Sequence, residues 1–195
     1  MPGVQNIKAG EGFIRTYDLI EVLNNDVYTA FEVLERDKQN QYLRRSVVRA
    51  VFSYIEALIE SIKVEIRSSI RIERPDFELS KKESELLGSL SPISQDKGRQ
   101  FPLEQNLKLT FKLAAKVWEL DFKLNSDGED YRDFVIAKSY RNKLTHPKTF
   151  YDVEVTDDDM HYYSVAGMWV QEEFRRLFKA RVDNLEAYIN KHLVN

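Results

Sequence analysis

The sequence predicts an all-α fold, an up-and-down bundle of four to five main helices, from three observations. Apolar residues recur at steps of three and four along several long segments, which is typical of helices that bury one face. Most of the seven glycines and five prolines fall outside these segments. No internal repeat or low-complexity tract interrupts the pattern. A chain of 195 residues can bury a proper core, so we expect a single domain over 1–195 with a flexible N-terminus at 1–13.

The first two helices are predicted over residues 14–34 and 41–72. The first carries apolar residues at helical spacing, namely Tyr17, Ile20, Val27, Phe31 and Leu34. The second has a longer apolar stripe of the same kind, made of Val48, Val51, Phe52, Ile55, Leu58, Ile59, Ile62, Ile66 and Ile70. Its other side carries charges of alternating sign at Arg45, Arg49, Glu56, Glu60, Lys63 and Arg67. Charges in this pattern are suited to pairing along an exposed helix face.

Residues 73–101 break this periodicity and predict an irregular connecting insertion, because prolines and glycines stand among polar residues. Within it, Ser80 and Glu83 have the spacing of a capping box, which predicts a short helix starting at Ser80. Pro102 is well placed as the first residue of a further helix, predicted to run to about Leu124. Its apolar arc is wide, so we expect it at the buried centre of the bundle.

Two more helices complete the prediction. One begins near Asp127 and ends at Thr145 or His146, because a proline follows and disfavours helical geometry in the residue before it. A connector with some strand-like alternation is expected at 149–155. Thr156 then opens a long helix to about His192, with three aspartates in the first turn complementing the helix dipole. A glycine inside it, Gly167, indicates close approach of another helix.

Composition limits the classes of function. The chain has no cysteine, which excludes disulfides, thiolate zinc sites and a cysteine nucleophile, and favours a reducing cytoplasm. Neither a signal-peptide pattern nor a membrane-spanning segment is recognisable, so we expect a soluble, cytoplasmic protein without membrane contact. The net charge is −3, so binding of nucleic acid would need a local basic patch. Positive charge is concentrated between 131 and 148, at Arg132, Lys138, Arg141, Lys143 and Lys148.

The most informative segment is Arg-Asn-Lys-Leu-Thr-His-Pro at 141–147. An arginine, an amide and an imidazole so close together are suited to holding a phosphodiester and transferring its protons. Asn142 and His146 are four residues apart, so on a helix we expect the amide to orient the imidazole. Arg141 and His146 are five residues apart, which places them on different sides of an ideal helix. The long arginine side chain and the unwinding of the helix before Pro147 would have to bring the two groups together.

Structural alternatives remain open for the same residues. Arg141 could form an ion pair with Glu56 or Glu60 of the second helix, and His146 could serve only as a helix C-cap. The protein would then be a noncatalytic helical module for dimerisation, partner docking, or binding of RNA or nucleotides. His161 with the aspartates at 157–159 could form a metal site, although these acids also fit a helix start. Tyr162, Tyr163 and Trp169 could stack bases or belong to the core.

The 141–147 segment resembles the signature of HEPN-domain ribonucleases, in which an arginine, a polar residue and a later histidine lie near the end of a late bundle helix. The resemblance implies a HEPN-like fold and metal-independent cleavage of RNA without a cofactor. Arg141, His146 and Asn142 would be catalytic, and Lys138, Lys143 and Lys148 are our candidates for RNA contacts. It also implies a homodimer, a role as a toxin or antiviral effector, and an antitoxin or regulatory partner. Some HEPN toxins carry a tyrosine that is modified where this chain has Lys148.

Overall fold

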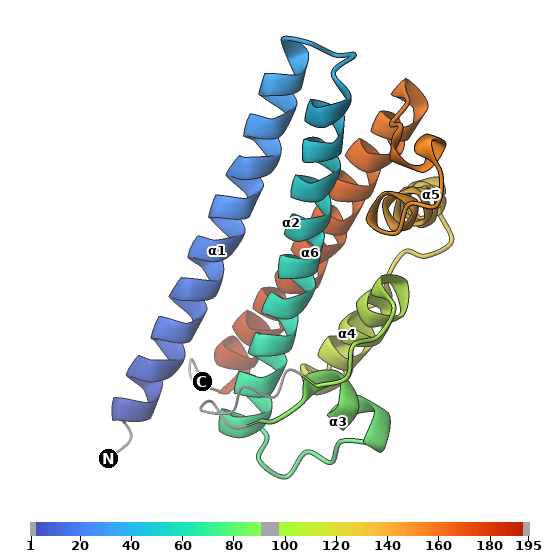
Figure 1. Cartoon of the computed structure of the whole chain (residues 1–195). Coiled ribbons are helices and arrows are strands. Elements are labelled where there is room, and N and C mark those ends of the chain that lie inside the picture. Colours follow the sequence, from blue (N-terminus) through green and yellow to red (C-terminus); the bar gives the residue numbers. More distant parts are fainter. Residues whose placement is uncertain (1–2, 91–97, 193–195) are drawn as a thin grey trace. The chain divides into compact units, whose positions relative to one another are not determined.

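The computed structural model describes residues 3–90 and 98–192, and these form six α-helices and no strand (Figure 1). The prediction of an all-α helical bundle is confirmed. The elements in order are α1 (Gly3–Glu35), α2 (Gln41–Ile72), α3 (Lys81–Leu87), α4 (Leu103–Val117), α5 (Glu129–Thr145), the 3-10 turn η1 (Phe150–Val153) and α6 (Asp157–His192).

The chain divides into two compact units. Unit 1 consists of Met1–Leu58 and Asn125–Gln171, and unit 2 of Ile59–Leu124 and Glu172–Asn195. The long helices α2 and α6 are each divided between the units. The first segment of each helix belongs to unit 1 and the second segment to unit 2. A single domain over 1–195 stays a prediction.

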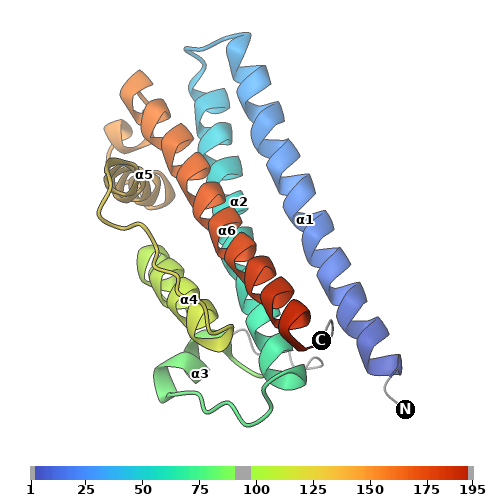
Figure 2. The ribbon, with the colours of Figure 1, turned by 180° about the vertical axis from the view of Figure 1, so that it is seen from behind.

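In unit 1, α1 and the first segments of α2 and α6 lie side by side, as two opposite views agree (Figures 1 and 2). Helix α5 is seen nearly end-on, so it crosses these helices. Its Phe134 ring packs against Trp169 of α6, with ring centroids 5.2 Å apart. Phe52 of α2 meets Tyr163 of α6 edge to face at 6.1 Å. These aromatic contacts fix α5 and α2 on either side of α6.

The entry to α6 is held by a buried arginine. Arg44 of α2 is 3% exposed, donates a hydrogen bond to the carbonyl oxygen of Val155 and forms an ion pair with Asp157. Thr156 and Asp159 add a reciprocal cap, each side chain accepting from the other's backbone N–H. The connector before α6 is therefore tied to α2 in the same unit.

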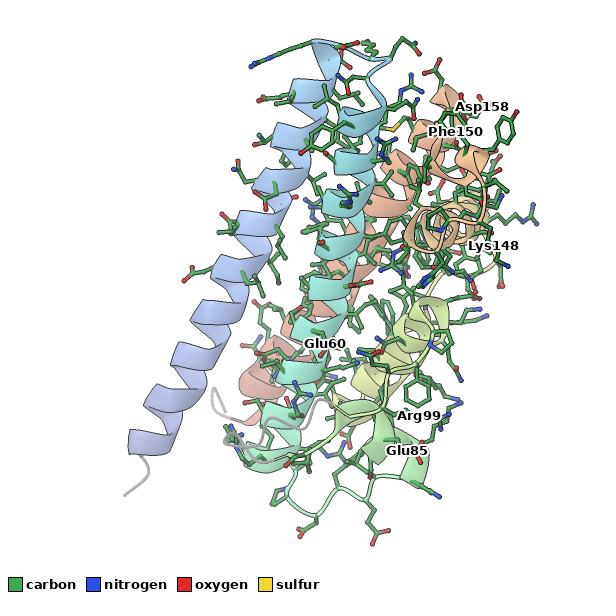
Figure 3. The ribbon with its side chains drawn as sticks, in the orientation of Figure 1. Glu60, Glu85, Arg99, Lys148, Phe150 and Asp158 are labelled. Carbon is green, nitrogen blue, oxygen red and sulfur yellow. The ribbon has the colours of Figure 1, made fainter. Side chains whose placement is uncertain are left out.

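In unit 2, helix α4 is not the fully buried centre that the sequence predicted, because one side of it is exposed at Gln105, Lys108, Lys112 and Lys116. Trp118 donates from its indole nitrogen to the hydroxyl of Ser69 at 3.0 Å, and its ring packs against Phe178. The capping box predicted at Ser80 is confirmed at the start of α3. Figure 3 shows the side chains of Glu85 and Arg99 in this unit, an exposed ion pair at 3.3 Å.

The apolar stripe predicted for α2 is confirmed in full. All nine of its members are buried: Val48, Val51, Phe52, Ile55, Leu58, Ile59, Ile62, Ile66 and Ile70. Gly167 of α6 also behaves as predicted, because a Cβ added there would lie 3.4 Å from a methyl group of Val51.

Three further sequence predictions need correction. Helix α1 begins at Gly3 instead of near Ile14, and Val4 and Ile7 continue the apolar spacing back from Ile14. A flexible N-terminus stays a prediction. Helix α4 ends at Val117 and not near 124, because Glu119 adopts a positive φ of 54° that no helix continues through.

One connector differs as well. Residues 149–155 contain the 3-10 turn η1 instead of a strand-like segment, because Asp152 accepts from the backbone N–H groups of Lys148 and Thr149 and winds the chain. The segment at 73–101 contains α3, the short helix expected from Ser80, and Gly98 returns the chain past α3 at a φ of 74°. Residues 91–97 of this segment lie outside the described residues.

Candidate functional site

Helix α5 presents Arg141 on its packed face. Phe134 and Ala137 are fully buried on that face, and Arg141 follows one turn later at its half-buried edge. The helix ends at Thr145. His146 is its C-cap, with φ −131° and ψ 60°, and donates its backbone N–H to the carbonyl oxygen of Asn142 at 3.1 Å. The helix therefore ends at Thr145, as predicted from the proline at position 147.

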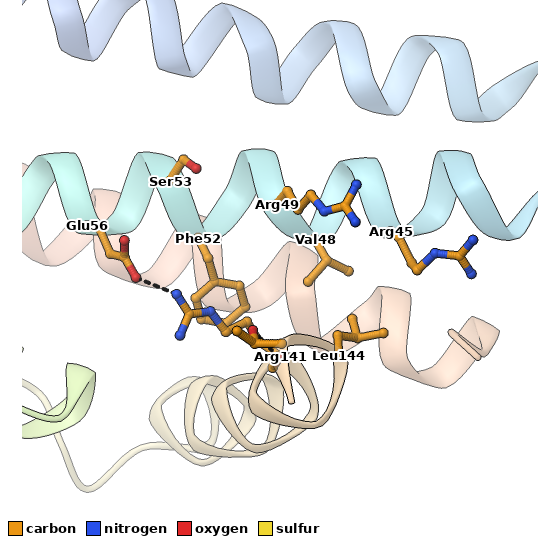
Figure 4. A pocket seen from close by; sticks show the side chains of 9 residues that line it. Arg45, Val48, Arg49, Phe52, Ser53, Glu56, Arg141 and Leu144 are labelled. Atoms are coloured by element: carbon orange, nitrogen blue, oxygen red, sulfur yellow. Dashed lines mark hydrogen bonds and ion pairs between the residues drawn. The ribbon is translucent and has the colours of Figure 1, made fainter. Parts of the chain in front are cut away.

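The guanidinium of Arg141 is paired with a carboxylate of α2. Its Nη2 donates to Glu56 Oε1 at 2.7 Å (Figure 4). The guanidinium carbon also lies 5.6 Å from the centre of the Phe52 ring. The alternative that Arg141 forms an ion pair with Glu56 is thus confirmed, whereas Glu60 pairs with Lys63 on its own helix.

Arg141 also lines a pocket with two further arginines, and we call it the arginine pocket. It encloses about 380 Å³ and its lining residues are Arg45, Val48, Arg49, Phe52, Ser53, Glu56, Arg141, Leu144 and Thr145. In Figure 4, Arg45 and Arg49 come from α2, and Arg141 and Leu144 come from α5. The lining carries three guanidinium groups and one carboxylate, so an anionic ligand is favoured.

The two α2 arginines differ in how they are held. Arg45 donates to the carbonyl oxygen of Val153 at 3.0 Å, which leaves its charge without a carboxylate. Arg49 has no hydrogen bond or ion pair with any described residue. Sequence reasoning placed both on a solvated face and missed them as site residues. The available signal was their spacing of four, which puts both on one face of the helix.

His146 and Asn142 stand apart from this pocket. Within the described part of the chain, neither is among the residues that line it, and both side chains are exposed. The amide oxygen of Asn142 accepts from Arg141 Nη1 at 3.5 Å, and no described hydrogen bond joins the Asn142 side chain to the imidazole. The predicted hydrogen bond between the Asn142 amide and the imidazole is not found among the described residues, and of the three residues only Arg141 lines the pocket.

The three lysines predicted to contact RNA have different surroundings. Lys138 is half-buried on α5. Lys143 Nζ lies 4.9 Å from the centre of the Tyr140 ring. Lys148 is exposed after the end of α5 (Figure 3). None of them lines the arginine pocket as the described residues define it.

A second pocket lies on the other side of Leu144, and we call it the tyrosine–acid pocket. It encloses about 400 Å³ and is lined by Tyr140, Lys143, Leu144, Tyr151, Asp152, Glu154, Thr156, Asp158, Asp159, Tyr162 and Tyr163. Leu144, in the last turn of α5, is the residue that the two pockets share. Sequence reasoning named Tyr162 and Tyr163 as alternatives for base stacking but did not foresee this pocket.

Two groups in the tyrosine–acid pocket have shifted pKa values. Hydrogen bonds from the backbone N–H groups of Lys148 and then Thr149 hold the pKa of the Asp152 carboxyl below its usual value. Burial, with smaller contributions from Asp159 and Tyr140, raises the pKa of Tyr163 well above that of a free phenol. At neutral pH Asp152 is therefore ionised and Tyr163 is a neutral hydroxyl.

The metal-site alternative at His161 finds no support in the geometry. Its imidazole lies 4.0 Å from the Asp133 carboxylate, whereas the aspartates at 157–159 lie in the first turn of α6, where Asp157 pairs with Arg44 and Asp159 caps the helix. Among residues 3–90 and 98–192, no three histidine or acidic side chains are grouped so that they could hold a metal ion. No helix in that part of the chain combines the length and the apolar character that crossing a bilayer requires.

No protein-family model matches this chain, and no curated protein or solved structure was found to match it. The likeness to HEPN domains accordingly depends on the 141–147 segment and on the all-α fold.

Proposed function

We propose that this protein is a metal-independent endoribonuclease of the HEPN type, whose arginine pocket binds the phosphate at which the RNA is cut. The observation that carries the proposal is the convergence of Arg45, Arg49 and Arg141 on one solvent-accessible pocket beside the end of α5. Guanidinium groups bind phosphate oxygens in a bidentate manner. Arg49, which has no described partner, is free to make the first contact.

In the proposed reaction, the RNA 2′-hydroxyl attacks the adjacent phosphorus and the bond to the 5′-oxygen breaks. The products are a 2′,3′-cyclic phosphate and a 5′-hydroxyl, with no change in oxidation state. Arg141 neutralises the charge that builds on the non-bridging oxygens, and loss of one such donor costs roughly 100- to 1,000-fold in rate. His146 takes the proton from the 2′-hydroxyl or gives one to the departing oxygen.

The exposed position of His146 fits a group that meets its substrate only when RNA is bound. Catalytic hydrogen bonds often form only in the substrate complex, so an imidazole outside the pocket of the free protein remains a candidate. In a homodimer, two copies of His146 would divide the acid and base roles. The resemblance to HEPN domains also favours a role as a toxin or antiviral effector with a regulatory partner.

A noncatalytic helical module is the second candidate, and one observation favours it. The Arg141 guanidinium is already paired with Glu56 at 2.7 Å and covers the Phe52 ring, as an arginine would whose role is to hold α5 against α2. In this reading the arginine pocket binds an RNA or nucleotide phosphate without cutting it.

Incubation with RNA in the presence of a chelator distinguishes the candidates. The proposed function predicts cleavage by the wild-type protein with cyclic-phosphate ends, and its loss in His146→Ala and Arg141→Ala. His161→Ala is the matched control, because this exposed histidine lies on α6 and does not line the arginine pocket. Wild-type protein that binds RNA without cleaving it, or His146→Ala that cleaves as fast as His161→Ala, would exclude the proposed mechanism.

A further inference from the structure

Tyr163 lines the tyrosine–acid pocket with a buried side chain. The side chain is 1% exposed, and its ring packs on Phe52 inside unit 1. No hydrogen bond joins its hydroxyl to any described residue, and Asp159 and Tyr140 of the same lining both act on its pKa. The hydroxyl is not among the described buried atoms that lack a partner, so it is open to the pocket, where a ligand can form a hydrogen bond with it.

Two carboxylates in the lining likewise have no hydrogen-bond or ion-pair partner among the described residues. Asp152 and Asp159 are occupied, since each accepts from backbone N–H groups as a cap. Glu154 and Asp158 are exposed and make no hydrogen bond or ion pair with a described residue. Carboxylates accept hydrogen bonds only, so these two favour a ligand that presents N–H donors.

The pocket also offers a flat aromatic surface. Tyr151 is 79% exposed at its rim, and Phe150 beside it is 77% exposed. Figure 3 shows Phe150 and Asp158 at the end of the unit where η1 meets the start of α6. Exposed tyrosine rings are surfaces on which nucleobases stack.

The position of the pocket connects it with the phosphate site. Leu144 lines both the arginine pocket and the tyrosine–acid pocket, so the two adjoin across one side chain on the last turn of α5. A nucleotide has the matching arrangement, an anionic phosphate joined through a sugar to a flat base. Phosphate in the first pocket would direct the base toward the second.

We infer that the tyrosine–acid pocket is a nucleobase site selective for guanine, formed by Tyr151, Tyr163, Glu154 and Asp158 next to the phosphate pocket. The Watson–Crick edge of guanine presents two neighbouring donors, N1–H and the N2 amino group, which one carboxylate can accept together. Adenine and cytosine each offer a single amino group next to an acceptor that a carboxylate repels. This inference rests on the proposed function, because it names the base that the same RNA site recognises.

A basic protein segment is the competing occupant, since acids and aromatic rings also attract arginine and lysine. The arrangement favours a nucleotide, because a cationic side chain makes no use of the three arginines across Leu144 and is repelled by them.

Calorimetric titration of the wild-type protein with GMP, AMP, CMP and UMP tests the inference without requiring cleavage. We expect GMP to bind at least roughly tenfold more tightly than the other three, as a bidentate base contact provides. The double variant Glu154→Gln/Asp158→Asn should lose this preference, and Tyr151→Ala should weaken all four. Asp130→Asn is the matched control, because this exposed acid in the first turn of α5 is outside the pocket lining.

Equal affinity for the four nucleotides, or a guanine preference that survives the double variant, would overturn the inference. So would binding of a hexa-arginine peptide that the double variant abolishes while no nucleotide binds. The result is separable from the proposed function. A guanine preference in a protein that does not cut RNA leaves the base site standing and removes the nuclease, whereas cleavage without base preference does the reverse.

Discussion

Replacing Glu56 by glutamine separates the two interpretations of Arg141, because it removes the partner's charge while nearly keeping its shape. The Arg141 side chain is 31% exposed and that of Glu56 is 50% exposed. An ion pair so open to water contributes roughly 0.2–1 kcal/mol to stability. We therefore expect Glu56→Gln to lower the free energy of unfolding by less than about 1 kcal/mol. At this chain length, that is a melting temperature lowered by up to about 4 °C.

Arg141→Ala should cost more, because it also removes the contact with the Phe52 ring at 5.6 Å. A cation–π contact of this kind contributes about 0.5–1 kcal/mol. The expected total is roughly 1–2 kcal/mol. A double-mutant cycle with both substitutions, measured by urea unfolding, isolates the ion pair, and its coupling energy should fall in the range of about 0.2–1 kcal/mol.

Glu56→Gln should lower stability but raise the affinity for RNA. With the carboxylate neutralised, Glu56 no longer competes with a phosphate for the Arg141 guanidinium. Affinity for single-stranded RNA should rise by up to about fivefold, the equivalent of roughly 1 kcal/mol. Arg141→Ala should lower it. A coupling energy above about 2 kcal/mol, or an RNA affinity that falls in Glu56→Gln, would refute the reasoning and favour a purely structural arginine.

Three further predictions concern the fold that supports the site. Ile55→Ala should lower the free energy of unfolding by about 2–5 kcal/mol in a urea titration, because the side chain is fully buried. Gly98→Ala should cost at least about 1–2 kcal/mol, because φ is 74° and a Cβ would lie 2.5 Å from a backbone oxygen of α3. The pKa of Asp152 is lowered from 3.8, so its cap on η1 is fully present above pH 3.8 and is lost as the pH falls through the lowered folded value. Protection of the Lys148 and Thr149 amides, measured as the exchange rate relative to the intrinsic rate at the same pH, should fall on that acidification and should be low in Asp152→Asn at neutral pH.

Much of the fold could be predicted from local pattern. The stripe on α2 from Val48 to Ile70 repeats so regularly that only a helix buries it, and every member is buried. The capping box at Ser80 could be predicted for the same reason, since its residues are neighbours in sequence. The end of α4 could not be predicted in this way. The positive φ of 54° at Glu119 leaves no mark in an apolar periodicity that continues past it.

The site was predictable only in part, and the reason is also geometric. The motif located Arg141, and the i+4 rule indicated that Asn142 would hold His146. That rule fails here because the chain has already left helical geometry at His146, where ψ is 60°. Arg45 and Arg49 come from another helix, so their convergence with Arg141 depends on how α5 crosses α2. A single sequence carries no direct record of such a crossing.

The Arg141–Glu56 pair bears on function even though it looks like a structural bond. A buried pair would be costly to break, whereas this one is half-exposed, and its loss costs no more than about 1 kcal/mol. A phosphate entering the arginine pocket would exchange one anionic partner of Arg141 for another and gain Arg45 and Arg49 as well. Glu56 then keeps the guanidinium extended into the pocket in the free protein, which reduces the ordering cost when an anion binds. On this argument Arg141 would bind Glu56 in the free protein and a phosphate in the complex. The rise in RNA affinity expected for Glu56→Gln then cannot exceed the small free energy of the Arg141–Glu56 ion pair.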